Sequence, residues 1–291
     1  MRILFVGDVV GRAGRQAIRT HLPNCISRWK VDLTIVNGEN AADAGFGITR
    51  PVYDEILAAG ADAVTLGNHS WNRKEALQFI DECPRLVRPI NYLAGTPGTG
   101  AVLIEAKNGR RALVINALGR LFMEPVEDPF SRIAAELDAH PLGRSVQATI
   151  VDFHCEATGE KHAAGHFCDG RASLVVGTHT HTPSADDRIL PAGTAFITDV
   201  GMTGDYNSIV GMAREEPLRR FTTGIPMGRF EPASGEATLC AVLVDTDERS
   251  GLALGIAPIR IGGCLKPVLP SFAGEKASSP TASGLASTSW D

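Results

Sequence analysis

The chain has 291 residues, 44% of them hydrophobic and 21% charged, which is enough to bury a substantial core in one large or two small domains. Its net charge of -5 excludes a general attraction to nucleic acid or to an anionic membrane, so an anionic ligand would need local cations to hold it. Its six cysteines form no Cys-x-x-Cys pair, which argues against a zinc ribbon or redox motif and predicts free, mostly buried thiols in a reducing compartment.

Short apolar runs rich in β-branched residues recur along the chain and predict buried strands. In chain order they occupy residues 3–6, 33–36, 63–66, 112–115, 148–153, 174–176 and 195–197. Segments with helical spacing of apolar residues lie among the first of them, at residues 15–22, 51–59 and 74–80. This alternation predicts an α/β sheet with layers on both faces. Later runs at residues 240–244 and 252–261 predict a further pair of strands, which we expect to be antiparallel.

The composition changes near Lys266, beyond which Ser, Thr, Ala, Pro and Gly dominate. Such a segment buries too little apolar surface to offset the entropy of ordering it. We therefore predict one domain over residues 1–265 and a disordered tail over residues 266–291. The sequence has no signal peptide pattern and no apolar stretch of the ~20 residues that a membrane span requires, so we expect a cytoplasmic protein without a membrane partner.

Several of the predicted strands are followed by side chains that bind metals. These side chains are Asp8, Glu39, Asn40, Asn68, His154, His179 and His181. In α/β sheets, ligands bind at the carboxyl ends of the strands. If the strands are neighbours, all of these donors converge on one spot.

The donors outnumber the four positions around one tetrahedral ion and suit two ions, with Glu39 as the candidate bridging carboxylate. Two ions about 3.5–4 Å apart hold both the attacking and the leaving oxygen of an in-line displacement, and they lower the pKa of a bound water toward ~7. The set contains imidazole, carboxylate and amide but no thiolate, which suits iron, manganese, zinc or cobalt.

Each part of this pattern has an alternative interpretation. A lone His-x-His such as His179-Thr180-His181 is weak evidence for a metal site, although in an extended segment the two imidazoles would point the same way. The glycines before Asp8, Glu39, Asn68 and Thr178 would let the backbone turn tightly, but plain turn chemistry uses glycine too. His69, next to Asn68, is expected to donate a proton to the leaving group, or else to be hydrogen-bonded beside the ligands. Because metal-binding side chains recur after several predicted strands, the sequence favours a metal site over these alternatives.

The order of these motifs resembles that of the calcineurin-like metallophosphoesterases. The motifs are Asp8, Gly38-Glu39-Asn40, Gly67-Asn68-His69, His154 and Gly177-Thr178-His179-Thr180-His181. Val10 and Glu39 stand where that superfamily has a histidine and an aspartate. With those departures, residues 1–11, 37–42, 152–154 and 199–204 are similar to the bacterial YmdB-like family, and the similarity runs from Met1 to about Ile261.

The resemblance implies a four-layer sandwich of two mixed sheets flanked by helices. It implies a di-iron or di-manganese centre, with zinc, cobalt or magnesium as alternatives, and a metal-dependent phosphodiesterase that hydrolyses cyclic nucleotides, notably 2′,3′-cyclic AMP. A metal-bound hydroxide would be the nucleophile and His69 the proton donor. Family members tend to self-associate, so we also expect a homo-oligomer.

The resemblance also divides the ligands between the two ions. Asp8, Asn40 and His181 would bind one ion. Asn68, His154 and His179 would bind the other, and Glu39 would bridge them. Two other functions remain open: a phosphomonoesterase or nucleotidase at the same centre, and a regulatory nucleotide-binding protein with little turnover.

Overall fold

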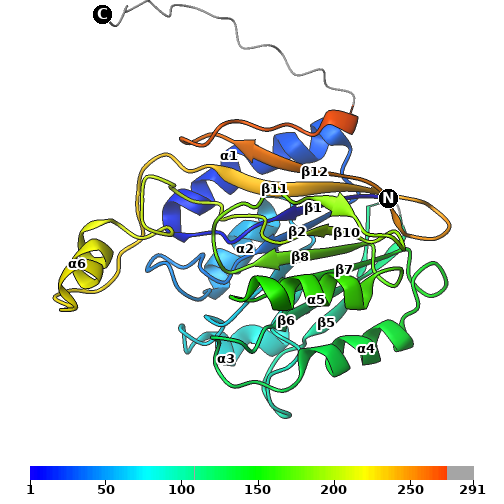
Figure 1. The fold of residues 1–291 in the computed structure, drawn as a ribbon, viewed down its shortest axis with the longest axis horizontal. Coiled ribbons are helices and arrows are strands. Elements are labelled where there is room, and N and C mark those ends of the chain that lie inside the picture. Colours follow the sequence, from blue (N-terminus) through cyan, green and yellow to red (C-terminus); the bar gives the residue numbers. More distant parts are fainter. Residues whose placement is uncertain (108, 274–291) are drawn as a thin grey trace, which may run out of the picture.

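A computed structural model describes residues 1–107 and 109–273 of the chain (Figure 1). Its first half contains β1 (Arg2–Val6), α1 (Gly11–Trp29), β2 (Leu33–Asn37), α2 (Arg50–Ala58), β3 (Ala63–Thr65), α3 (Ala76–Phe79), the 3-10 turn η1 (Ile80–Glu82), β4 (Leu86–Val87), β5 (Ala101–Glu105), β6 (Arg111–Leu118) and α4 (Pro129–Ala139). Its second half contains β7 (Ala148–His154), α5 (Thr158–Cys168), β8 (Leu174–Thr178), β9 (Arg188–Ile189), β10 (Ala195–Ile197), α6 (Glu215–Thr223), β11 (Leu239–Thr246), β12 (Ala253–Ile261) and η2 (Ser271–Ala273).

Within the described residues the strands form two mixed sheets. One six-stranded sheet has the order β12-β11-β1-β2-β3-β4, and the other has the order β5-β6-β7-β8-β10-β9. In the first, β1 to β4 are parallel, while β11 is antiparallel to β1 and to β12. In the second, β6, β7, β8 and β10 are parallel, and β5 and β9 are antiparallel edge strands. The predicted antiparallel pair near the end of the chain is confirmed.

The two sheets pack face to face, and helices cover their outer faces, which gives four layers. In β1, Ile3 and Phe5 belong to the apolar cluster between the sheets, whereas Leu4 and Val6 belong to the cluster beneath α1 and α2. A third cluster joins the second sheet to α4 and α5. Strands buried on both faces carry apolar residues on both of them, which is why several of the predicted strands show no alternation. The predicted fold class is confirmed.

The strands that precede the metal-binding side chains do not all share one sheet. β1, β2 and β3 are neighbours in the first sheet, and β7 and β8 are neighbours in the second. The alternation of predicted strands and helices indicated a single sheet, whereas the structure has two. Convergence of the donors depends on the carboxyl ends of both sheets lying at the same end of the sandwich.

Several elements differ from the prediction. The first helix is longer than residues 15–22, because Cys25 and Trp29 continue its buried face. The predicted helix at 74–80 is divided into α3 and η1. α4, α5 and α6 were not predicted. In Figure 1, α6 projects from the body of the molecule, and its apolar side chains Leu218 and Phe221 are exposed, so the helix does not bury an apolar face as a packed helix does.

The predicted tail lies partly outside the described residues. Up to residue 273 the chain stays attached to the domain: Val268 and Arg260 exchange two backbone hydrogen bonds, and Phe272 packs against the outer apolar cluster. Residues 274–291 are not described, and the division at residue 265 stays a prediction. Among the described helices, none has the length and apolar character needed to cross a membrane. The six cysteines are free, and all but Cys264 are buried.

The apolar layer between the sheets should dominate the stability of the fold. Phe5 is fully buried there, so Phe5→Ala should lower the free energy of unfolding by about 3–5 kcal/mol. Urea denaturation measures the change. The matched control is Phe221→Ala on α6, where the side chain is 82% exposed and the expected change is within about 0.5 kcal/mol. Equal losses in the two variants would contradict this description of the core.

Candidate metal centre

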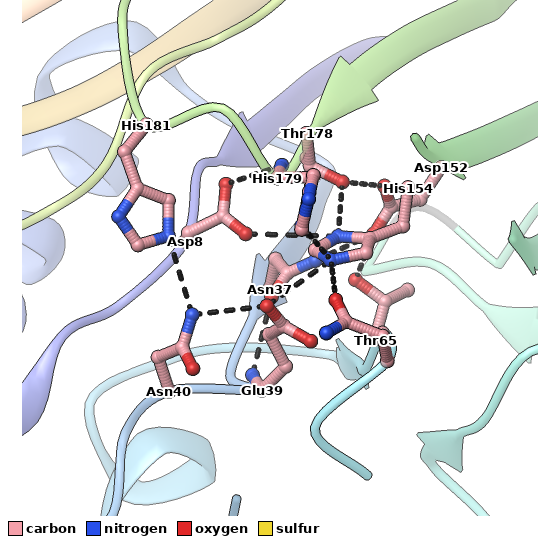
Figure 2. A network of polar contacts seen from close by, with 12 residues as sticks. Asp8, Asn37, Glu39, Asn40, Thr65, Asp152, His154, Thr178, His179 and His181 are labelled. Carbon is pink, nitrogen blue, oxygen red and sulfur yellow. Dashed lines mark hydrogen bonds and ion pairs between the residues drawn. The ribbon is translucent and has the colours of Figure 1, made fainter. Parts of the chain in front are cut away.

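The side chains predicted to bind metal meet at the carboxyl ends of both sheets (Figure 2). Asp8, Glu39 and Asn68 follow β1, β2 and β3, while His154 ends β7 and His179 follows β8. Two groups have ligand atoms within 4.8 Å of one another: Glu39 with His154 and His179, and Glu39 with Asp8 and His181. Glu39 belongs to both groups, as a bridging carboxylate must. The assignment of ligands to particular ions stays a prediction.

A chain of hydrogen bonds fixes which nitrogen of His154 faces the centre. The Thr178 hydroxyl donates to Asp152 Oδ1 at 2.7 Å, so Thr178 Oγ1 can only accept from His154 Nδ1, which lies 2.8 Å away. This assignment puts a proton on Nδ1 and leaves the lone pair of Nε2 directed at the centre. Asp152 is itself held by Asn37 and Thr65.

Electron-rich atoms surround that lone pair. His154 Nε2 lies 2.9 Å from Asn68 Oδ1, 3.1 Å from Glu39 Oε1 and 3.1 Å from His179 Nδ1. His179 Nε2 lies 3.1 Å from Glu156 Oε2, and donation there leaves its Nδ1 as a second lone pair. Four acceptors this close repel one another unless positive charge lies among them. A metal cation fits this requirement, and the donors suit it.

The second group of donors has unsatisfied atoms. Asp8 Oδ1 and Asn40 Oδ1 are buried without a hydrogen-bond partner in the described protein. His181 Nδ1 donates to the carbonyl oxygen of Val210 at 2.9 Å, which directs its Nε2 toward Asn40. Buried polar atoms are normally paired, so Asp8 Oδ1 fits a cation as its partner. Asn40 directs its amide nitrogen at Glu39 and His181, so its amide group would have to turn over before its oxygen could bind a cation at the centre.

The electrostatics of the cluster favour positive charge. Burial raises the pKa of Asp8 above its usual value. Burial alone would lower the pKa of His154, but Glu39, Asp8 and Asp152 raise it to about 9. Burial and His154 lower the pKa of His179 to about 3. Positive charge is therefore favourable either as a proton on His154 or as a metal ion, and a metal ion requires the unprotonated Nε2.

His69 lies beside the centre without joining the ligand groups. Its backbone nitrogen donates to Glu39 Oε2 at 3.1 Å, and Asn68 Nδ2 lies 3.4 Å from its Nε2. Its ring lines a cavity of about 360 Å³ that Glu39 and His181 also line. This position suits a group that acts on a bound substrate. A larger cavity of about 510 Å³ beside α1 is lined by none of the predicted site residues.

Two local expectations about the backbone were wrong. His179 and His181 are not in an extended segment: their φ angles are 94° and 64°, and both rings reach the centre from a turn. The glycines are needed for space and not for their φ angle. A Cβ on Gly67 would lie 2.2 Å from Glu39 Oε2, and one on Gly177 would lie 1.7 Å from the Thr198 carbonyl oxygen.

The sequence interpretation assigned no role to several polar residues that support the centre. Asp152 lies two residues before His154 on the same face of β7, a spacing that could have identified it. Asp199 Oδ2 accepts from Lys161 Nζ at 2.8 Å and from the Thr180 hydroxyl at 2.7 Å, so this buried ion pair holds the turn between His179 and His181. Glu156 belongs to none of the motifs, so the sequence did not indicate that it lies beside the centre.

Gly67 provides a test of whether the cluster binds metal. Gly67→Ala should abolish tight binding of Mn²⁺, because the added methyl group would displace Glu39 or His154. Gly159→Ala is the matched control, since its Cβ would meet nothing within 4 Å. Isothermal titration of both variants with Mn²⁺ measures the difference. Wild-type affinity in Gly67→Ala would contradict the location of the centre.

Asp152 tests the orientation of His154. Asp152→Asn lets an amide donate to Thr178, so the hydroxyl no longer has to accept from His154 Nδ1. Mn²⁺ affinity should fall roughly 10- to 100-fold, the usual effect of removing a partner that orients a ligand. Asp138→Asn, with a side chain that is 76% exposed, serves as the control in the same titration. An unchanged affinity in Asp152→Asn would show that this hydrogen-bond chain does not matter.

Comparisons with known proteins agree with this geometry. A family model described as YmdB-like protein matches residues 4–259. A 2′,3′-cyclic-nucleotide 2′-phosphodiesterase of Bacillus subtilis (strain 168) is 50% identical over 261 residues, which cover 90% of this chain and 97% of that relative.

Solved structures give the same result. A hypothetical protein from Thermus thermophilus is similar with a TM-score of 0.83 and 43% identity, over 91% of this chain and 100% of that chain. A Mycoplasma pneumoniae protein described as a novel phosphatase has a TM-score of 0.83 and 34% identity, over 90% and 93% of the two chains. The family match covers most of the sequence, and the chain therefore belongs to the YmdB-like family.

Proposed function

We propose that this protein is a metal-dependent phosphodiesterase that hydrolyses cyclic nucleotides, with 2′,3′-cyclic AMP as the favoured substrate. The observation that carries the proposal is the group of acceptors around His154 Nε2, which requires positive charge beside the cavity that Glu39 and His179 line. The substrate comes from the Bacillus subtilis relative, whose description names a cyclic-nucleotide phosphodiesterase.

In the proposed mechanism, Asp8, Asn40 and His181 would hold one cation. Asn68, His154 and His179 would hold the other, and Glu39 would contribute its carboxylate to both sites. When bound, the two cations would supply Lewis acidity and lower the pKa of a bound water toward ~7.

The protein side chains would perform the remaining steps. Glu39 fixes His69 through the hydrogen bond from the His69 backbone nitrogen. His69 then donates a proton to the leaving oxygen of the ester, so that the leaving group departs as a neutral alcohol and not as an alkoxide. The Thr178–Asp152 chain keeps His154 in the tautomer that binds a cation.

Three finer statements belong to the same proposal. Iron or manganese is the favoured metal, because the family resemblance implies one or the other; the donor set suits zinc and cobalt equally, and these and magnesium are the alternatives. A homo-oligomer in the cytoplasm is the expected state of the protein. A phosphomonoesterase at the same centre is the second candidate, since relatives from Mycoplasma are described as putative phosphatase/phosphodiesterase.

Hydrolysis assays separate these candidates. Mn²⁺-loaded protein should turn over 2′,3′-cyclic AMP faster than 3′,5′-cyclic AMP or 5′-AMP, and Glu39→Gln should reduce turnover to background because the shared carboxylate is lost. Glu105→Gln, an exposed glutamate on β5, is the control. Fastest turnover of 5′-AMP would favour the phosphomonoesterase. No turnover above the Glu39→Gln background on any substrate would defeat the enzyme assignment and favour a nucleotide-binding protein.

His69 has a separable role. His69→Ala should lower kcat by about 10²- to 10⁴-fold, the usual contribution of a general acid, while Mn²⁺ binding stays intact. His166→Ala, on the exposed face of α5, is the control and should leave kcat unchanged. Steady-state kinetics and Mn²⁺ titration together test this role. An unchanged kcat in His69→Ala would assign the proton donation to another group.

A further inference from the structure

The cavity beside the metal centre has two chemically different sides. Its polar side contains Glu39, Asn40, His69 and the two histidines of the His179-Thr180-His181 turn. Its other side is formed by four apolar side chains, which we call the apolar wall: Phe46, Val210, Met212 and Phe230. The residues of the cavity that are proposed to act on the phosphate lie on the polar side, and the side chains of the wall offer the phosphate no polar or charged group.

The apolar wall has a fixed position relative to the centre. Met212 is buried in a small cluster against which Phe46 and Phe230 pack. The carbonyl oxygen of Val210 accepts the hydrogen bond from His181 Nδ1 at 2.9 Å, so one residue belongs to the wall and also orients a proposed ligand. Val210 has a φ of 46°, which is strained for a β-branched residue and persists only where the surroundings enforce it.

The two aromatic rings are also held. The Phe46 ring contacts the His69 ring edge to face, with centroids 4.8 Å apart. The guanidinium of Arg220 lies over one face of Phe230, 4.1 Å from the ring centroid, and Arg220 is in turn paired with Glu216 at 2.8 Å. A wall braced in this way can bind a flat ring without first becoming ordered, which lowers the cost of binding.

We propose that Phe46, Met212 and Phe230 form the subsite for the nucleobase of the substrate. The inference rests on the proposed function and deepens it, because the phosphate would bind on the polar side while the base packs on the apolar wall. Stacking on aromatic side chains tolerates any base, since every base has a π-face. The wall residues contact the face of the base and offer no polar groups to its edge, so purines bind better than pyrimidines, and adenine and guanine bind about equally.

Kinetics with and without a base test the subsite. The substrates are 2′,3′-cyclic AMP, 2′,3′-cyclic UMP and base-free ribose 2,3-cyclic phosphate. Phe46→Ala and Phe230→Ala should each raise the KM for 2′,3′-cyclic AMP by roughly 10- to 100-fold, the range expected for one stacking contact. In Phe230→Ala, kcat and the reaction of the base-free ester should stay as in the wild type. In Phe46→Ala, whose ring packs on His69, any loss with the base-free ester should be smaller than the loss with 2′,3′-cyclic AMP. Phe221→Ala, on the exposed face of α6, is the control and should leave KM and kcat unchanged for both 2′,3′-cyclic AMP and the base-free ester.

The opposite pattern overturns the proposal. Equal losses with 2′,3′-cyclic AMP and the base-free ester would mean that the wall supports His69 and the metal centre and does not bind the base. An unchanged KM for 2′,3′-cyclic AMP in both variants would also overturn it, as would a lower KM for the uridine than for the adenosine substrate.

A binding experiment separates this proposal from the proposed function. Adenosine has no phosphate, so saturation-transfer NMR with adenosine requires neither turnover nor metal binding. The base protons H2 and H8 should receive more saturation than the ribose protons, and the excess should disappear in the Phe46→Ala/Phe230→Ala double variant. Base signals without hydrolysis would support the subsite and defeat the hydrolase alone. No excess at H2 and H8 in the wild type would overturn the subsite, whatever the hydrolysis assays give.

Discussion

The rest of the site depends on the contacts that the buried carboxylate of Glu39 makes. Its Oε1 faces His154 Nε2 from the second sheet, and its Oε2 accepts from the backbone nitrogen of His69, in the loop that follows β3 of the first sheet. Burial opposes the charge on Glu39, but His154 and His69 favour it more strongly, and they lower the pKa of Glu39 below its usual range. Because one of these partners comes from each sheet, both contacts form only where the carboxyl ends of the two sheets meet.

Around this contact the protein places a second set of polar residues that touch no substrate. Thr178 and Asp152 determine the tautomer of His154, and the buried pair of Lys161 and Asp199 holds the turn that carries His179 and His181. Buried ion pairs contribute little net stability, because desolvation offsets most of their attraction. We infer that the Lys161–Asp199 pair serves the geometry of the turn more than the stability of the fold.

Much of this arrangement was predictable from the sequence, for a physical reason. Strands buried on both faces leave uninterrupted apolar runs such as residues 3–6, and the polar residue that comes soon after such a run, here Asp8, is easily recognised. The family resemblance implied two sheets, but the apolar runs did not show which strand belongs to which sheet, because that depends on pairing between distant segments. The φ angles of His179 and His181 were equally hidden, since no local pattern marks a left-handed histidine. α6 was not predicted, because it packs little of its surface against the rest of the protein and therefore needs no buried stripe of apolar residues.

The two layers that form the sandwich meet through apolar side chains such as Ile3, Phe5, Val114 and Ile150, which have no directional preference. Directional bonds also join the sheets at the carboxyl ends, where Asn37 and Thr65 of the first sheet reach Asp152 of the second. An ion held jointly by Glu39 and His154 would act there as a cross-link between layers. Such an ion binds the folded chain alone, so its concentration would enter the folding equilibrium by mass action. The same atoms that prepare the chemistry would then also resist the separation of the two halves of the sandwich.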